Sequence, residues 1–141
     1  MSTTLSALKV TPGVTSALVL ERENLATQLQ TQIGCDIFDV VHLEDGIDVF
    51  VDDEGLLVAR PALNVALTVL AHQLGSQAVL FGTGIVLGGD DASGETLGLT
   101  EAQRERVLGA IMQKPSPEVL EKLCESLSPF PGVVQLLGLS A

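Results

Sequence analysis

The first twenty residues of the chain show the short apolar and alternating runs that are typical of β-strands. Residues 5–10 and 14–20 each carry such a run, and Thr11, Pro12 and Gly13 separate them. Proline and glycine at these positions favour a tight turn, since proline presets its backbone angle and glycine tolerates a positive one. The pattern predicts two short strands joined by a turn.

The apolar spacing then changes from the period of a strand to that of a helix. Leu25, Leu29 and Ile33 recur every four residues. Asn24 precedes them as a plausible N-cap, and Gly34 follows them as a plausible helix stop. The segment therefore predicts a helix of about ten residues.

The next segment alternates β-branched strands with acidic turns. Residues 36–43 and 47–52 are rich in β-branched side chains and flank Asp45-Gly46, a strong hairpin signal. Residues 53–55 (Asp-Glu-Gly) form a second predicted turn, and residues 56–59 a further strand. Together they predict a three-stranded meander in which Gly46 and Gly55 are structural.

A strongly apolar helix is predicted to begin at Pro61, a residue that the first turn of a helix tolerates. Its leucines recur at spacings of four, three and four, namely Leu63, Leu67, Leu70 and Leu74. Asn64 is one of the few polar residues in this stretch, and a buried amide must find hydrogen-bond partners. We expect Asn64 to be structural, with its side chain bound to backbone groups near the turn at 53–55.

The remainder predicts one or two strands over 77–87, a loop over 88–98, and a pair of helices over 101–112 and from 116 onward. Short connections between strands favour an α+β domain with a largely antiparallel sheet and helices packed on one face. The length fits one domain, 1–141, with a core at 5–90 and a C-terminal helical extension at 99–141.

Composition narrows the classes of partner. The net charge is −11 and aromatic residues make up 3%, without Trp or Tyr, so direct nucleic-acid binding is disfavoured and a basic protein partner is favoured. No apolar run approaches the roughly 20 residues of a membrane helix, and a secretion signal is not evident. The two cysteines, Cys35 and Cys124, suit a reducing cytosol, so we expect a soluble cytoplasmic protein.

Motifs for cofactors, metals and catalysis are weak. The glycine-rich segment 82–88 imitates a dinucleotide loop, but apolar residues continue through it like a strand. His42 and His72 lack a second ligand at zinc spacing, and carboxylates rather than cations surround Cys35. Asp90, Asp91, Ser93 and Glu95 are a candidate cation site in a loop, and a solvated loop is the alternative. We expect no cofactor, no functional metal and no enzyme.

Acidic residues concentrate in the predicted meander, and seven of them form the candidate partner surface. If Asp45-Gly46 is a two-residue turn, Asp39 lies opposite Asp52 and Asp48 shares their face. Like charges facing one another cost stability, which suggests a use, although carboxylates can also protect a strand edge and aid solubility. The candidate residues are Asp39, Glu44, Asp45, Asp48, Asp52, Asp53 and Glu54.

The same segment resembles a family of small uncharacterised proteins from actinobacteria, their phages and mobile elements, a domain of unknown function. The resemblance covers roughly residues 5–90. It departs from the family pattern at Asp52 and at Cys35, which stands where a second glycine is expected. The matching elements are Leu25 to Gly34, Leu43-Glu44-Asp45-Gly46, Asp53-Glu54-Gly55, Pro61 to Asn64, and Gly82 to Gly88. The resemblance implies an accessory role and supplies no catalytic residues.

The leading hypothesis is a non-enzymatic interaction or modulator protein, in its sharper form a nucleic-acid mimic whose carboxylates occupy a basic groove. The alternatives are a small-ligand binder that uses the glycine-rich segment 82–89, and a minor enzyme. The apolar tail 132–139 predicts either docking on the domain or burial in a homodimer.

Overall fold

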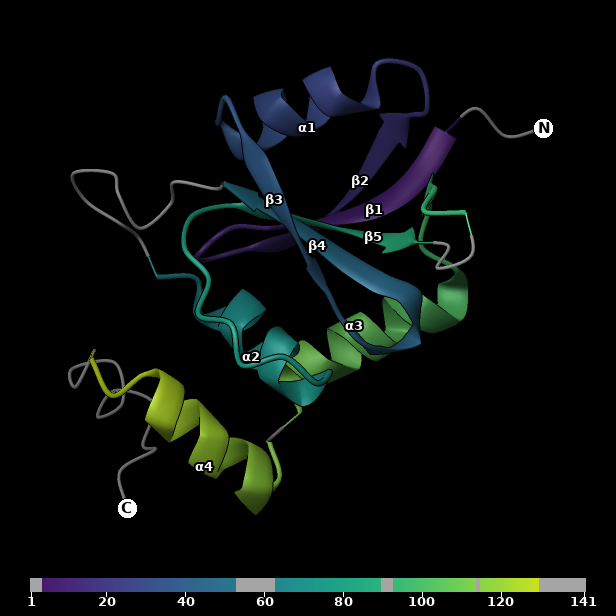
Figure 1. The fold of residues 1–141 in the computed structure, drawn as a ribbon. Coiled ribbons are helices and arrows are strands. Elements are labelled where there is room, and N and C mark those ends of the chain that lie inside the picture. Colours follow the sequence, from purple (N-terminus) through teal and green to yellow (C-terminus); the bar gives the residue numbers. More distant parts are fainter. Residues whose placement is uncertain (1–3, 53–62, 90–92, 114, 130–141) are drawn as a thin grey trace.

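A six-stranded antiparallel sheet forms the centre of the molecule (Figure 1). The computed structural model describes residues 4–52, 63–89, 93–113 and 115–129. The strands are β1 (Thr4–Val10), β2 (Thr15–Glu21), β3 (Phe38–His42), β4 (Ile47–Asp52), β5 (Gly84–Gly89) and β6 (Thr96–Leu97). Their order is β2-β1-β5-β4-β3, and β6 pairs with the end of β5. The predicted α+β class and antiparallel sheet are confirmed, while the third meander strand, at 56–59, lies outside the described residues.

Helices cover both faces of this sheet. They are α1 (Leu25–Ile33), α2 (Val65–Gln73), α3 (Glu101–Met112) and α4 (Pro117–Ser126). Figure 1 shows α1 on one side of the sheet and α2 with α3 on the other, while α4 packs against α2. The C-terminal helical pair is confirmed, but the prediction that all helices lie on one face was wrong for α1. Within the described residues, no helix has the length and apolarity that crossing a bilayer requires.

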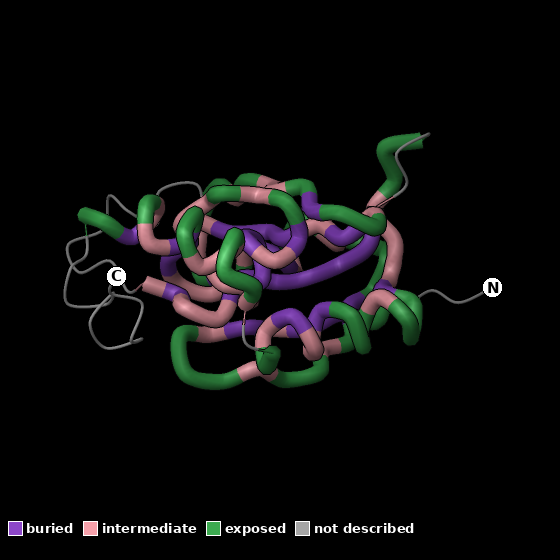
Figure 2. Tube along the Cα trace, turned by 90° about the horizontal axis from the view of Figure 1, so that it is seen from below, coloured by how far each residue is buried: buried purple, intermediate pink, exposed green. Residues whose placement is uncertain are grey.

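The inner strands explain why helices pack on both faces of the sheet. Successive residues of β4, from Val49 to Val51, are buried, and so are Ile85 to Leu87 in β5. Because neighbouring side chains of a strand point to opposite faces, such a run gives the sheet two apolar faces. Leu29 and Ile33 of α1 fill one core, and Leu67 and Leu70 of α2 fill the other. Figure 2 shows the buried segments in the interior and the exposed ones around the periphery.

Strand β5 joins two hairpins that the chain makes much earlier. It pairs with β1 on one side and β4 on the other, and therefore holds the β1–β2 hairpin beside the β3–β4 hairpin. A side chain on Gly84 would collide with Leu67, so glycine lets α2 approach the sheet closely. The predicted loop at 88–98 was partly wrong, since Gly88 and Gly89 belong to β5 and residues 96–97 form β6.

Helix α2 begins later than the sequence predicted. Leu63 forms a β-bridge with Phe81, and the Asn64 backbone N–H donates to the Leu80 carbonyl at 2.8 Å. These extended contacts delay the helix to Val65, with Asn64 as its N-cap. The described helix is consequently four residues shorter at its start than the pattern from Pro61 implied.

Helices α3 and α4 begin where the sequence predicted. Thr100 and Gln103 form a reciprocal capping box at the start of α3, and the Ser116 side chain accepts from the Val119 N–H at the start of α4. Caps of this kind act between residues three apart, which is why local sequence was sufficient to find them. The apolar tail at 132–139 lies outside the described residues.

Candidate functional site

The acidic hairpin pairs in a different register from the predicted one. Asp39 lies opposite Val51, and Asp52 lies opposite Phe38. The connection is longer than a two-residue turn because residues 44–46 form one turn of 3-10 helix, in which Asp45 and Gly46 both have positive φ. The predicted pairing of Asp39 with Asp52 was therefore wrong.

This register divides the carboxylates between the two faces of the sheet. Asp48 and Asp52 share the α1 face with Phe50, whereas Asp39 shares the other face with Val51. Asp39 is exposed, but Asp48 and Asp52 are half-buried. A one-residue shift moves side chains to the opposite face, so the expected row of carboxylates on one exposed face does not form.

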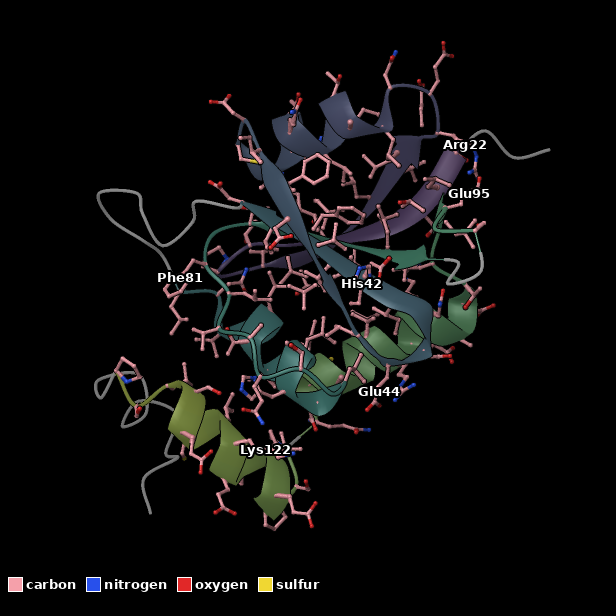
Figure 3. The ribbon with its side chains drawn as sticks, in the orientation of Figure 1. Arg22, His42, Glu44, Phe81, Glu95 and Lys122 are labelled. Carbon is pink, nitrogen blue, oxygen red and sulfur yellow. The ribbon has the colours of Figure 1, made fainter. Side chains whose placement is uncertain are left out.

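The acidic tip of the hairpin is docked on α3. Arg106 approaches Glu44 at 2.9 Å and Asp45 at 3.6 Å, and Gln103 donates from its Nε2 to the Asp45 carbonyl at 2.8 Å. Figure 3 shows Glu44 beside this helix. Sequence reasoning missed Arg106 and Gln103 because they lie about 60 residues beyond the hairpin, and α3 meets it only in the folded chain.

Asp48 also has a close partner. Its Oδ1 lies 2.8 Å from Nδ1 of the exposed His42. Cys35 lies before the start of β3, and His42 lies at its end. Within the described residues, no cluster of three or more His, Cys, Asp or Glu side chains could hold a metal ion. Asp53, Glu54, Gly55, Asp90 and Asp91 lie outside those residues.

Asn64 is completely buried at a junction of three segments. Its Nδ2 donates to the Val10 carbonyl at 3.0 Å and to the Gly82 carbonyl at 2.7 Å, and its Oδ1 accepts from the Leu67 N–H at 3.0 Å. The expectation of partners near residues 53–55 was wrong, since both amide hydrogens go to Val10 and Gly82. The side chain ties the end of β1 and the approach to β5 to the start of α2.

An open pocket of about 520 Å³ lies where the end of α1 meets the start of β3 and the end of β4. Gly34, with φ of +79°, ends the helix, and Gln30 donates from its Nε2 to the Asp36 carbonyl at 2.7 Å. These two features fold the chain after α1 back beside the helix. The lining residues are Thr27, Gln30, Thr31, Gly34, Cys35, Asp36, Ile37 and Asp52.

The pocket is electrostatically negative. Burial raises the pKa of the Cys35 thiol, and the carboxylates of Asp52 and then Asp36 raise it further. None of the eight described residues that line it is basic, and the C-terminus of α1 adds partial negative charge. The thiol is thus kept protonated, which disfavours nucleophilic chemistry, while the surroundings favour a cation.

Comparison with protein families matches most of this structure to one family model. The model of the family DUF3846, a domain of unknown function, matches residues 5–111. The chain belongs to the DUF3846 family. The match continues beyond residue 90, where the resemblance in the sequence ended, and takes in β6 and nearly all of α3. Neither the curated proteins nor the solved structures gave a match.

Proposed function

We propose that this DUF3846 domain is a non-enzymatic binding module whose pocket at the end of α1 accepts an arginine or lysine side chain of a basic protein partner. The observation that carries the proposal is that Asp36 and Asp52 line the same pocket beside Cys35 and both raise its pKa, while none of the described lining residues is basic. A guanidinium or ammonium group entering this pocket would gain attraction from both carboxylates.

The other lining groups suit the same ligand. The Thr31 hydroxyl donates to the Thr27 carbonyl at 3.0 Å, which leaves the hydroxyl oxygen able to accept a hydrogen bond from a cation. Ile37 lines the pocket and is 61% exposed, so it offers an apolar contact for the aliphatic part of an Arg or Lys side chain. The pocket thus offers carboxylates to the cationic head of such a side chain and an apolar contact to its stem.

Two earlier hypotheses have less support. A nucleic-acid mimic needs a continuous row of carboxylates, and the hairpin divides Asp39 from Asp48 and Asp52. A dinucleotide loop needs free backbone N–H groups at a helix N-terminus, whereas residues 84–89 form a strand between two neighbours. We therefore favour the pocket over both the hairpin and the glycine-rich segment.

The biological setting of the proposal is a modulator in a phage or mobile element, inside a reducing cytosol. The resemblance to proteins of actinobacteria and their phages supports the first part. The two free thiols, Cys35 and Cys124, are compatible with the second.

The proposal is tested by titrating the protein with an arginine-rich peptide while NMR follows the backbone amides. We expect shifts centred on residues 27–37 that weaken as salt rises, because screening reduces charge attraction. A double variant, Asp36→Asn with Asp52→Asn, should lose most of this binding. The matched control, Glu121→Gln with Glu125→Gln, removes two exposed charges from α4 and should retain it.

Two outcomes would contradict the proposal. Peptide shifts spread evenly over acidic surfaces would show nonspecific attraction by the net charge of −11. Nonspecific attraction would also be shown if the pocket variant and the α4 control lost peptide binding to the same extent.

A further inference from the structure

Among the described strands, β2 and β3 are the two edges of the sheet, and they are protected to different extents. At the β3 edge, the Asp39 carboxylate accepts from the Val40 backbone N–H at 2.8 Å and places a charge on the strand. At the β2 edge, residues 11–20 contain no charged side chain, in a chain whose net charge is −11. Exposed edge strands normally carry charges, prolines or bulges, because unpaired backbone groups invite another strand. The β2 edge is therefore the one that another strand can join.

One end of β2 is already closed. Nε2 of Gln28 donates to the Glu21 carbonyl, and Oε1 of Gln28 accepts from the Glu21 N–H, both at 2.8 Å. At Glu21, therefore, the Gln28 amide makes the two backbone hydrogen bonds that a neighbouring strand would otherwise make. It does so at this residue of β2 only. Arg22, the next residue, pairs with Glu95 at 2.7 Å, and Figure 3 shows these two side chains together.

The position of Glu21 identifies which other backbone groups face outward. In an antiparallel ladder, successive residues alternate between bonding to the partner strand and pointing away from it. Since the backbone groups of Glu21 point away from β1, those of Val19, Ala17 and Thr15 do so as well. Among the described residues, no hydrogen bond reaches these three from outside the strand.

The side chains at this edge are small, neutral and accessible. Val19 is 67% exposed, and Ala17 is also exposed. Both lie on the face that α2 and α3 cover elsewhere, opposite Ser6 and Leu8 of β1. A strand that pairs here would bury Val19 without placing like charges opposite each other.

We propose that a second copy of this chain pairs antiparallel through β2, with Ala17 on the two-fold axis. Three residues of β2, at alternate positions, point their backbone N–H and C=O groups outward, and such groups can bind an extended strand. Each copy of the chain offers the same open strand to the other. The part of β2 that is open to another strand ends at the turn at 12–13 on one side and at the Gln28 bond to Glu21 on the other. Ala17 lies midway along it, so a symmetric pairing that uses Thr15, Ala17 and Val19 of both copies has its two-fold axis at Ala17.

This register has defined contacts. Thr15 lies opposite Val19 of the partner subunit, and Ala17 lies opposite its own copy, so that the two sheets join across the axis. Glu21, the one acidic residue of β2, falls opposite Gly13 of the partner subunit, so the two Glu21 carboxylates lie far apart. Because each copy carries a net charge of −11, association should strengthen as salt rises. That is the opposite of the salt dependence expected for the pocket.

The first test measures mass by light scattering during gel filtration, over a range of concentrations. We expect concentration-dependent growth from the 14.7 kDa chain to twice that mass. Val19→Lys should shift the protein to monomer, because two added charges enter the joined edge. The matched control Ser6→Lys adds the same charge on the same face one strand further in, and should remain dimeric. Circular dichroism of both variants tests whether they remain folded.

The second test fixes the register by cross-linking in a Cys35→Ser, Cys124→Ser background. Ala17→Cys should form a reducible dimer under mild oxidation, since its two copies face each other at roughly 5.5 Å between Cα atoms. Val14→Cys, also exposed, should not, because its copies would lie roughly 20 Å apart, six residues along the strands. The proposal is overturned if the chain is monomeric at every concentration. It is also overturned if the dimer persists in the Val19→Lys variant and the Ala17→Cys variant does not cross-link.

Discussion

His72 and Ser126 face each other across the contact between α2 and α4, with Nε2 of the histidine 2.7 Å from Oγ of the serine. Nδ1 of His72 lies 2.7 Å from the Thr68 carbonyl, which can only accept, so Nδ1 carries a hydrogen and donates. In the neutral imidazole, Nε2 then accepts from the Ser126 hydroxyl. The pair fixes α4, which lies beyond the family match, onto the DUF3846 domain.

This pair is part of a polar stripe along α2. Asn64, Thr68 and His72 are the buried polar residues of the described chain, and they recur every four positions. Asn64 binds the Val10 and Gly82 carbonyls, and the Thr68 hydroxyl accepts from the Leu80 N–H at 3.1 Å. A largely apolar helix is thereby oriented by three specific side chains, each bonded to a different neighbour.

Replacing Ser126 with alanine should weaken the docking of α4. The change leaves Nε2 of the buried His72 without its partner, which costs about 1–3 kcal/mol of unfolding free energy or of local docking free energy. Hydrogen exchange should become faster in α4 and remain unchanged in the sheet. Ser128→Ala, two residues away and exposed, is the control and should behave as the parent does. Unchanged exchange in the Ser126 variant would contradict the assignment.

Replacing Asn64 with leucine should destabilise the whole domain. It leaves the Val10 and Gly82 carbonyls and the Leu67 N–H without their partner, and each buried unpaired group costs about 1–3 kcal/mol. Chemical denaturation should show a loss of at least about 3 kcal/mol. Ser116→Ala is the control. It removes the N-cap of α4 but no contact between buried segments, and it should cost about 0.5–2 kcal/mol. An Asn64 variant no less stable than this control would show that the junction is unimportant.

Replacing Arg106 with glutamine should have a small effect that depends on salt. Arg106 and its partners Glu44 and Asp45 are all exposed, so the ion pairs contribute at most about 1 kcal/mol. The loss in unfolding free energy should disappear at high salt. Arg104→Gln is the control, since Arg104 forms no ion pair with a described residue. A loss that persists at high salt would indicate that Arg106 acts through packing.

Cys35 should alkylate slowly at neutral pH. Burial and the carboxylates of Asp52 and Asp36 raise its pKa, so the thiolate fraction is below that of an unfolded cysteine peptide. Asp36→Asn removes one negative charge, lowers this pKa and should speed alkylation by iodoacetamide in a Cys124→Ser background. Alkylation as fast as in the peptide, or no response to Asp36→Asn, would contradict the assigned electrostatics.

The raised pKa of Cys35 also sets the sign of a stability effect. The folded chain keeps the thiol proton to higher pH than the unfolded chain does. Stability from this group is therefore complete at neutral pH and is lost as pH rises through the raised pKa. The effect is confined to alkaline conditions, and Cys35→Ser should remove it from the pH profile.

Much of the fold could be predicted because the signals were local. The capping box of Thr100 and Gln103 located α3, the cap at Ser116 located α4, and four-residue spacing located α1. The turn at 11–13 located the β1–β2 hairpin. In each case the deciding interactions join residues within a few positions, so the sequence of one segment contained the information.

The candidate site was decided by contacts that no single segment contains. Both Asp45 and Gly46 adopt positive φ while Gln103 and Arg106 hold the tip, and the resulting register separates Asp39 from Asp48 and Asp52. The pocket likewise requires Asp52 at the end of β4 to meet Asp36 beyond α1. Sequence alone determined which elements form, because turn and helix signals act over three or four residues. Tertiary structure decided which carboxylates come together, because strand register and helix docking depend on groups tens of residues apart.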